Sequence, residues 1–462
     1  MALFGESVAY ALQPTAVSPT PTWTLIPVSE DPVTPAPTVT WRGPLVGADY
    51  SLPPTIPPAA TGVVAPAATV NEPPAAGQPT PTIPPPTGPQ PTTVPFLDPA
   101  QMGIQVDINL DDDDWAEAMR RVQDDLAIGW LKVQIPWEDM QPNGPDQADG
   151  AFFRRVELHL QDAQRRGLNV LVSVAKAPLW ARTDPTEDGP PDDPQRLAEF
   201  VALMLREFDG LIDAVEIWNE PNLIREWRGV LPFNGAGYMQ LFGPTYNAIR
   251  AYSPTLPIIT AGLAPAGNIP GLAVADREYL RQMYAAGLGN YQDVYIGVHP
   301  YSWGNAPDAT CCGTRGWDDD PHFFFADTLR EYRDIMVANG HANRQMWFTE
   351  FGWPTWEGFP GEPGADSRWI LFNDRWAQAN YTIRAFEIGQ QTDFIGPMIL
   401  WNLNFAVLEG LVENGDTRAA YSIVIPGAGG VLDLNAGGLT ERPLYWMIYD
   451  AVRPDVQLER YD

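Results

Sequence analysis

The stretch Ile217-Trp218-Asn219-Glu220-Pro221-Asn222 decides how this chain of 462 residues is organised. It follows a short apolar run, residues 211–215, which is typical of a buried strand. A second stretch, Trp347-Phe348-Thr349-Glu350-Phe351-Gly352-Trp353, has the same form later in the chain. Each stretch puts one glutamate at the carboxyl end of a predicted strand, beside aromatic residues. A fold that gathers its strand ends would therefore bring Glu220 and Glu350 face to face.

Strand-like and helix-like segments alternate from residue 101 onward. Eight strand–helix units in about 360 residues are the number and length expected of a (β/α)8 TIM barrel with insertions. In that fold the active site lies at the carboxyl ends of the strands. The predicted strands are residues 103–108, 131–135, 169–174, 211–220, 257–261, 294–299, 345–350 and 394–401. The predicted helices lie near residues 111–122, 152–166, 194–209, 237–252, 276–287, 323–339, 367–389 and 441–452.

Residues 1–97 differ in composition from the rest and hold about half of the 49 prolines. Proline removes backbone donors and favours an extended chain, so we expect this segment to be mostly disordered and to form no packed core. Its Pro/Thr-rich composition is typical of a semi-rigid linker or stalk that tethers an extracellular domain to a cell surface. A disordered tail without that role is the alternative. We therefore expect a linker over residues 1–97 and a catalytic barrel domain over residues 101–462.

The formal net charge of −30 argues against nucleic acid or an anionic membrane surface as a partner, because both would repel the chain. Neutral sugars are indifferent to this charge. The sequence contains no apolar run long enough for a transmembrane helix. The first six residues lack the basic and apolar segments of a signal peptide. An extracellular or cell-surface location is therefore expected from the stalk alone.

The two cysteines, Cys311 and Cys312, are adjacent, and the four histidines form no metal-binding pattern. We therefore expect no structural metal and no cofactor. The cysteine pair forms either a vicinal disulfide in an oxidising compartment or two reduced thiols in a loop. The acidic run at residues 111–114 suits the first turn of a helix better than a calcium site.

Two facing carboxylates are the equipment that a retaining glycosidase needs. One carboxylic acid protonates the leaving oxygen, and a second, ionised carboxylate about 5 Å away attacks the anomeric carbon. The fourth and seventh strands lie on opposite sides of a barrel mouth, so Glu220 and Glu350 can face each other across it. Two such glutamates, each among aromatic residues, indicate this chemistry far more strongly than one would.

These residues also carry a family resemblance. Residues 217–222 are similar to the strand-four Asn-Glu-Pro signature of clan A glycoside hydrolases, the group that contains families 5 and 39. Residues 349–352 resemble their strand-seven nucleophile segment, His299-Pro300-Tyr301 resembles their strand-six His-x-Tyr, and Trp401 resembles their strand-eight tryptophan. The resemblance covers residues 101–462. It implies a (β/α)8 barrel that cleaves O-glycosidic bonds of a β-linked poly- or oligosaccharide by double displacement, without a cofactor.

The resemblance assigns roles to single residues. It implies that Glu220 is the general acid/base and that Glu350 is the nucleophile. Asn219 would bond the sugar's 2-hydroxyl, Tyr301 would donate to the nucleophile, and His299 would line the same subsite. Indole packs well on the C–H face of a sugar ring, which suits Trp401 as the floor of the subsite. Further candidate substrate contacts near the strand ends are Trp137, Trp180 and Asn404.

The chain departs from the family pattern on the second strand. Clan members often carry an arginine there that supports the nucleophile, whereas this chain has Lys132. A lysine keeps the positive charge but loses the planar fork of the guanidinium. Glu216 precedes Glu220 on the same face of its strand, so we expect it inside the barrel, paired with a base such as Lys132.

Two alternatives to hydrolysis remain at this point. A non-catalytic carbohydrate-binding or structural surface protein could use the same barrel, because a fold does not fix a function. Transglycosylation would use the same residues with a different acceptor. The long loops at residues 301–321 and 352–366 could close one end of the cleft and make it a pocket.

Overall fold

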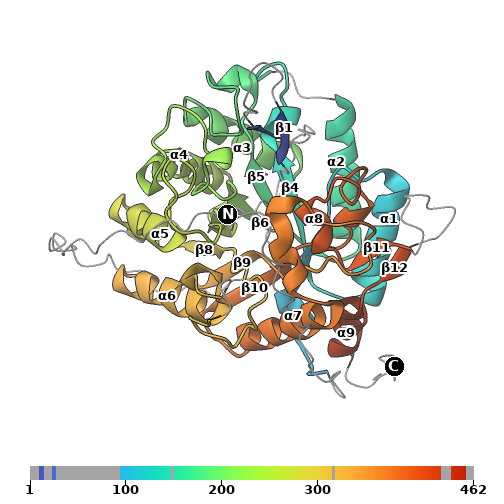
Figure 1. The fold of residues 1–462 in the computed structure, drawn as a ribbon. Helices are drawn as coiled ribbons and strands as arrows, with labels where there is room; N and C mark the ends of the chain where they lie inside the picture. Colours follow the sequence, from blue (N-terminus) through green and yellow to red (C-terminus); the bar gives the residue numbers. More distant parts are fainter. Residues whose placement is uncertain are drawn as a thin grey trace.

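Eight parallel strands close into a barrel at the centre of the molecule (Figure 1). The computed structural model describes residues 10–14, 23–27, 94–146, 150–314, 318–427 and 439–453. Around the barrel the strands follow the order β10-β3-β4-β5-β6-β7-β8-β9, which is their order along the chain. Their bounds are β3 Met102–Gln105, β4 Trp130–Pro136, β5 Asn169–Ala175, β6 Ala214–Ile217, β7 Ile258–Thr260, β8 Val294–Val298, β9 Met346–Phe351 and β10 Ile395–Leu400.

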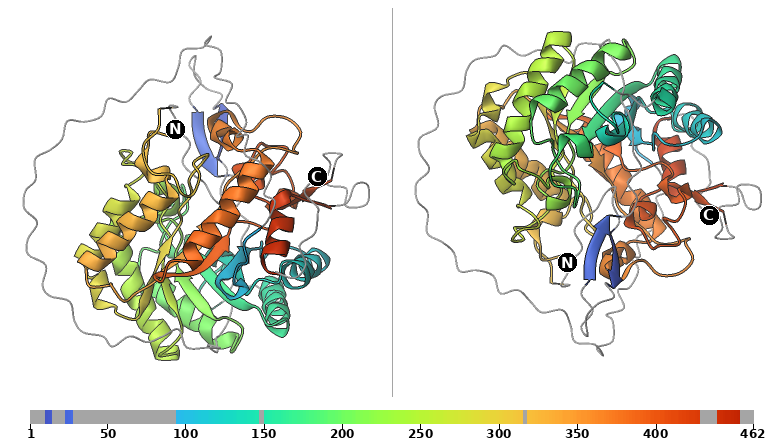
Figure 2. Two further views of the ribbon diagram at one scale, coloured as in Figure 1. Left: turned by 90° about the horizontal axis from the view of Figure 1, so that it is seen from below. Right: turned by 90° about the horizontal axis from the view of Figure 1, so that it is seen from above.

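A ring of helices surrounds the strands (Figure 1), and Figure 2 shows the same arrangement from below and from above. The predicted (β/α)8 architecture is therefore confirmed. No helix in the described part of the chain is both long enough and apolar enough to cross a membrane. The helices are α1 Asp112–Arg120, α2 Gly150–Arg165, α3 Gln195–Glu207, α4 Gly235–Tyr252, α5 Asp276–Ala285, α6 Phe325–Ala338, α7 Arg375–Gln390, α8 Thr417–Ala420 and α9 Pro443–Ala451.

The inside of the barrel is filled in layers, because successive side chains of a strand alternate between its two faces. One apolar layer gathers side chains from seven strands: Trp130, Leu171, Ala214, Ile259, Tyr295, Trp347 and Ile399. Two residues further along their strands, the same inward face carries Lys132 on β4 and Glu216 on β6. The apolar layer thus forms the floor on which a charged layer lies.

Three predicted elements differ clearly from the structure. The first strand, predicted over residues 103–108, ends at Gln105. The fourth strand ends at Ile217 instead of Glu220, because Trp218 and Glu220 have left-handed backbones, with φ of 76° and 39°. The single helix predicted over residues 367–389 is divided into a 3-10 segment, Ala365–Phe372, and α7. The division occurs because the side chain of Asp374 accepts the amides of Trp376 and Ala377 and so begins a new helix.

An insertion between β10 and α9 was not foreseen from the sequence. It contains a 3-10 turn, Phe405–Val407, then α8, and then strand β11 Val424–Pro426. Strand β11 pairs antiparallel with β12, Leu439–Glu441, which leads into α9. The insertion stands beside the barrel mouth on the side of the last strand.

Most of the predicted N-terminal linker lies outside the described residues, so its disorder and its stalk role stay predictions. Two described strands within it, β1 Tyr10–Pro14 and β2 Trp23–Pro27, pair as an antiparallel hairpin. The predicted domain boundary near residue 97 also stays a prediction. Val94 and Leu97 already belong to the core, and the Leu97 amide donates to the Ala451 carbonyl at 2.9 Å.

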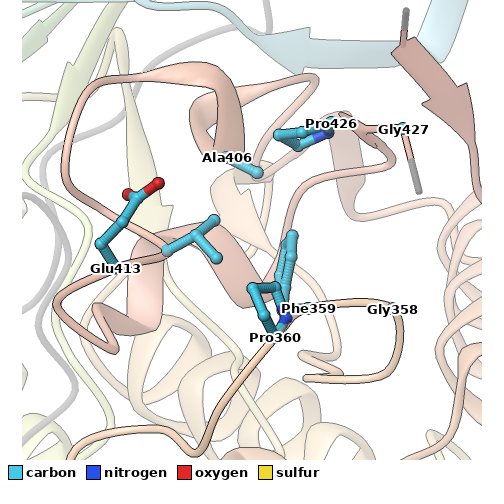
Figure 3. A pocket seen from close by; sticks show the side chains of 8 residues that line it. Gly358, Phe359, Pro360, Ala406, Glu413, Pro426 and Gly427 are labelled. Carbon is cyan, nitrogen blue, oxygen red and sulfur yellow. The ribbon is translucent and has the colours of Figure 1, made fainter. Parts of the chain in front are cut away.

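Loops 301–321 and 352–366 meet at the barrel mouth. The Trp353 indole donates to the Asn305 carbonyl at 2.8 Å, and the second loop also joins the insertion through the Thr355 amide and the Ala420 carbonyl at 3.0 Å. A separate small pocket lies between the second loop, at Phe359, and the insertion, at Ala406 and Pro426 (Figure 3); it has about 10 Å³ for solvent, which suits about one water and no sugar ring. In the first loop, Cys311 and Cys312 are joined by a disulfide.

The Asp374 cap predicts a measurable stability effect. Asp374→Ala removes the acceptor for two amides at the start of α7, so we expect a loss of about 1 kcal/mol in the free energy of unfolding. Denaturant titration followed by circular dichroism measures it. The control is Asp393→Ala, which removes an exposed aspartate just before β10. Equal stability of the two variants would contradict a capping role for Asp374.

Candidate active site

The two predicted catalytic glutamates meet at the barrel mouth, and both are fully buried. Glu350 is on β9, and Glu220 follows β6 on the opposite side of the barrel. One nitrogen, His299 Nδ1, lies 3.2 Å from Glu220 Oε1 and 3.8 Å from Glu350 Oε2. These two carboxylate oxygens can therefore be no further apart than the sum of those two distances.

Glu350 is surrounded by groups that favour its ionised form. Lys132 Nζ donates to Oε1 at 2.8 Å, and the Tyr301 hydroxyl donates to Oε2 at 3.0 Å. Burial by itself would raise the pKa of the Glu350 carboxyl. Lys132, His299 and Tyr301 outweigh that effect and hold the pKa below its usual value. Glu350 is therefore held as a carboxylate.

Lys132 is shared between Glu350 and Glu216. Its Nζ lies 3.2 Å from Glu216 Oε2, and all three side chains are fully buried. Burial would lower the pKa of the lysine, but the two carboxylates raise it above its usual value. The predicted pairing of Glu216 with Lys132 is thus confirmed. Lys132 therefore contacts both Glu350 and Glu216 from its position on β4.

Glu220 has different partners. Its amide donates to the Gly262 carbonyl at 3.1 Å, which ties the loop after β6 to the loop after β7. Asn222 strengthens this tie by donating to the carbonyls of Ala264 and Val274. The Glu220 carboxyl contacts His299 through Oε1 and accepts a short hydrogen bond from Arg225 through Oε2. A cation on its own loop therefore holds the second glutamate.

Arg225 lies between two carboxyl groups. Its Nη1 is 3.9 Å from Glu226 Oε1, while its Nη2 bonds Glu220. Burial raises the pKa of Glu226 to about 8, although Arg225 and Lys176 oppose this effect. Glu226 is consequently mostly protonated at neutral pH, which makes Glu220 the main charged partner of Arg225.

The His299 ring is closely packed by its neighbours. Its Nε2 lies 3.1 Å from Thr349 Oγ1. Gly262 faces the ring from the loop after β7, where an added Cβ would come within 2.2 Å of it. Only glycine leaves room for the imidazole between the two glutamates, so this glycine is needed for the geometry of the site.

Three buried side chains at the mouth carry polar atoms without a hydrogen-bond partner among the described residues. They are both amide atoms of Asn219, the indole nitrogen of Trp401 and the hydroxyl of Tyr421. The Tyr421 ring lies 4.9 Å from Trp401 and 5.3 Å from Tyr301, between centroids. Buried polar groups are usually paired, so this cluster can bind a ligand rich in hydroxyls.

The structure gathers six of the nine predicted site residues in one place: Glu220, Glu350, Asn219, His299, Tyr301 and Trp401. The other three lie apart. Trp137 is buried, stacks on Phe200 and donates its indole N–H to Gln141 at 2.8 Å. Trp180 is half-buried in the loop after β5, and Asn404 is buried after β10, with its side-chain oxygen unpartnered within the described chain. The substrate role of each residue stays a prediction.

Sequence reasoning missed two groups at the site. Arg225 follows the Glu220 motif by five positions, and a basic residue so close to a catalytic acid was the available signal. Tyr421 comes from the insertion after β10, and nothing in its local sequence indicates its position. Burial, Glu220 and Glu350 together raise the pKa of Tyr421 well above its usual value, so its hydroxyl stays protonated and able to donate.

The acidic groups at the mouth are paired with cations rather than gathered as metal ligands. Lys132 forms ion pairs with Glu216 and Glu350, and Arg225 forms an ion pair with Glu220. Among the described residues, no group of three His, Cys, Asp or Glu side chains could hold a metal ion.

Comparison of the whole chain with known proteins gives matches only at the level of structure. No family model matches the sequence, and no curated protein matches it. A family 39 glycoside hydrolase from Bacteroides cellulosilyticus WH2 matches with a TM-score of 0.57 at 16% identity, covering 78% of this chain and 66% of that chain. This chain therefore spans slightly less than two thirds of that protein.

Two further solved structures match at a TM-score of 0.50. A family 39 β-xylosidase from Caulobacter crescentus is 15% identical over 77% of this chain and 72% of that chain. A β-glucosidase from Exiguobacterium marinum is 11% identical over 77% of this chain and 98% of that chain. At the level of the fold, the predicted resemblance to clan A glycoside hydrolases is confirmed: this chain has the eight-stranded barrel of these enzymes.

The pairing of Lys132 with Glu350 predicts a pH effect. The lowered pKa of Glu350 stabilises the fold above the ordinary carboxyl pKa, and this stabilisation is lost as the pH falls through the lowered value. In Lys132→Met the main opposing charge is gone, so burial raises the pKa of Glu350. We expect the acidic limb of the kcat/KM profile on an aryl glycoside to move to higher pH. We also expect a loss of about 3–5 kcal/mol in the free energy of unfolding.

Lys176→Met is the matched control. Lys176 is the chain's other lysine and is equally buried near the mouth, but it pairs with Asp188 at 3.0 Å. This control should lose comparable stability without moving the acidic limb. An unmoved acidic limb in Lys132→Met would contradict the electrostatic role of Lys132.

Proposed function

We propose that this protein is a retaining glycoside hydrolase. The observation that carries the proposal is the pair of buried glutamates around one histidine, each with its own cation. Glu350 is the nucleophile and Glu220 is the general acid/base. The fold of family 39 enzymes supports the same conclusion at a coarser level.

The spacing of the two carboxyl groups supports retention of configuration. Retaining enzymes hold the groups about 5–5.5 Å apart, and inverting enzymes hold them about 6.5–9.5 Å apart to admit a water molecule. The two His299 distances bring one oxygen of each glutamate close to the same nitrogen, which is compatible with the shorter spacing. Together with the ionised state of Glu350, this supports the proposal that Glu350 attacks the sugar directly.

The first step forms a glycosyl–enzyme ester. Glu350 Oε attacks the anomeric carbon, the bond to the leaving oxygen breaks, and a proton on Glu220 passes to that oxygen. Lys132 and Tyr301 keep Glu350 ionised and aligned before the attack. Because the ester oxygen has lost its charge, both contacts weaken as the bond forms, so the same groups favour the later release of the carboxylate.

The second step hydrolyses the ester. Glu220, now ionised, removes a proton from water, and the resulting hydroxide attacks the anomeric carbon and displaces Glu350. The hydrogen bond from Arg225 suits this ionised form of Glu220. Arg225 thus supports the base that acts in the second step.

The sugar itself would use the unpartnered polar groups. Asn219 can bond a hydroxyl next to the anomeric carbon, as its place beside Glu220 in the sequence suggests. Tyr421 can donate to a second hydroxyl, and Trp401 offers both an indole face and an N–H. This set suits a neutral sugar with free hydroxyls.

A β-linked glycoside is the substrate class that we propose. Two of the matched proteins are a β-xylosidase and a β-glucosidase, and both have this fold. The extracellular location and the tether through residues 1–97 are part of the same proposal. They rest on the composition of that segment alone.

Variants of Glu220 test the division of roles. Glu220→Ala lacks the acid, so it should slow the hydrolysis of glycosides with poor leaving groups by about 10²–10⁴-fold. Dinitrophenyl glycosides need no protonation, so their first step should persist in this variant. Azide can replace the activated water, and it should restore turnover. Steady-state kinetics on a leaving-group series, with and without azide, measures these effects.

Glu226→Gln is the control, since this neighbouring buried carboxyl is mostly protonated at neutral pH. It should keep the leaving-group dependence of the wild type. An equal loss on good and poor leaving groups in Glu220→Ala, without rescue by azide, would remove Glu220 from the acid/base role. Binding of glycans without turnover of any glycoside would favour a binding protein on this barrel.

A further inference from the structure

A surface groove lies beside Trp180, at the end of the barrel where the strands finish. Its volume is about 370 Å³, within the range of about 300–1,000 Å³ common for ligand sites. The residues that form it include Trp180 and Arg182, from the loop after β5, and Asp192, from the segment just before α3. Strand β5 is the direct neighbour of β6, which leads to Glu220. The groove therefore opens on the same rim as the catalytic centre.

Trp180 is held rigidly at this groove. Its indole N–H donates to the Gln141 carbonyl in the loop after β4. Its ring meets Trp137 edge to face, with centroids 5.7 Å apart. The Gln141 side chain in turn accepts from the Trp137 indole and donates to the Pro145 carbonyl. A half-buried aromatic face that is fixed in this way costs little entropy when a ligand binds to it.

Polar side chains of both kinds line the groove beside Trp180. Arg182 can donate from its guanidinium, and Asp192 can accept through its carboxylate. Arg182 is held in place by Nη1, which donates to the Glu187 carbonyl. A donor and an acceptor beside an indole face match the hydroxyls and the faces of a sugar.

The charges of the groove indicate a neutral ligand. Arg182 and Arg196 line it together with Asp192 and Asp193, so positive and negative groups balance. A phosphate or uronate would be drawn by the arginines but repelled by the aspartates. A neutral sugar unit meets no such conflict.

We propose that this groove is a rim subsite, which binds one neutral sugar unit of an oligo- or polysaccharide while another unit occupies the catalytic centre. The sugar ring stacks on Trp180, and its hydroxyls accept from the Arg182 guanidinium and donate to the Asp192 carboxylate. The substrate of the proposed hydrolase is then a chain of sugars rather than a single glycoside. This inference rests on the proposed function for its substrate but uses residues outside the catalytic centre.

Chain-length dependence tests the rim subsite. Trp180→Ala should lower kcat/KM for the longest soluble oligosaccharide by about tenfold, through KM, because a stacked aromatic contact is lost. It should leave kcat/KM for an aryl monoglycoside unchanged, since that substrate cannot reach the groove. Asp192→Ala should lower kcat/KM on the long chain by about threefold or more and again spare the short one.

Leu179→Ala is the matched control. Leu179 precedes Trp180 and is 59% exposed, but it does not line the groove. It should leave both substrates unaffected. If Trp180→Ala unfolds the loop because the Trp180 packing is lost, Asp192→Ala still tests the rim subsite. Equal losses on long and short substrates, or no loss on either, would overturn the rim subsite and leave the proposed hydrolysis intact.

A separate binding measurement tests the rim subsite if the proposed hydrolysis is not found. If the wild type hydrolyses no glycoside, the same oligosaccharides are titrated by calorimetry against wild type and Trp180→Ala. Weaker binding by the variant would support the groove as a carbohydrate site in a protein without turnover. Equal affinity, or no binding of any oligosaccharide, would overturn the groove as a sugar site.

Discussion

The charge balance at the centre of this barrel depends on one buried lysine. Lys132 lies between Glu216 and Glu350 with no exposure to solvent, and removing it would leave two buried carboxylates without their cation. One cation cannot neutralise two carboxylates, so hydrogen bonds must stabilise the remaining negative charge. The Gly262 amide donates to Glu216, and Tyr301 donates to Glu350. The segments after β7 and β8, which supply these donors, are thereby tied to the two carboxylates.

The same electrostatics distinguishes the two glutamates that we propose to be catalytic. Glu350 is bonded by a lysine fixed on a strand, whereas Glu220 is bonded by Arg225 on its own loop. A contact within a strand layer is rigid because the whole barrel must move to change it. A contact within one loop can change with little cost elsewhere. This difference suits a nucleophile that must stay ionised and an acid/base that must gain and lose a proton.

The strand ends were predictable from the sequence, since each rests on a local pattern. An apolar run followed by a polar or aromatic residue located Glu220, His299, Glu350 and Trp401, and strand alternation located Glu216 inside the barrel. The closed barrel then brought them together, as eight strand–helix units require.

Loop conformation was not predictable in this way. Tyr421 reaches the site from an insertion of small elements. Arg225 reaches it because the backbone makes left-handed turns around Glu220. The break before α7 depends on the side chain of Asp374. Trp137 shows the converse: it follows a strand end, yet it packs into the core behind Trp180.

The most direct test of the central claim, that Glu350 is a nucleophile, is the intact mass of the protein after incubation with a panel of 2-deoxy-2-fluoro glycosyl fluorides. These reagents form the glycosyl–enzyme ester readily but release it slowly. A mass increase of one fluorosugar, located on Glu350 by peptide mapping and absent in Glu350→Gln, is the predicted result. It would also identify the sugar accepted at the cleavage site. No adduct from any sugar, or an adduct on another residue, would contradict the role given to Glu350.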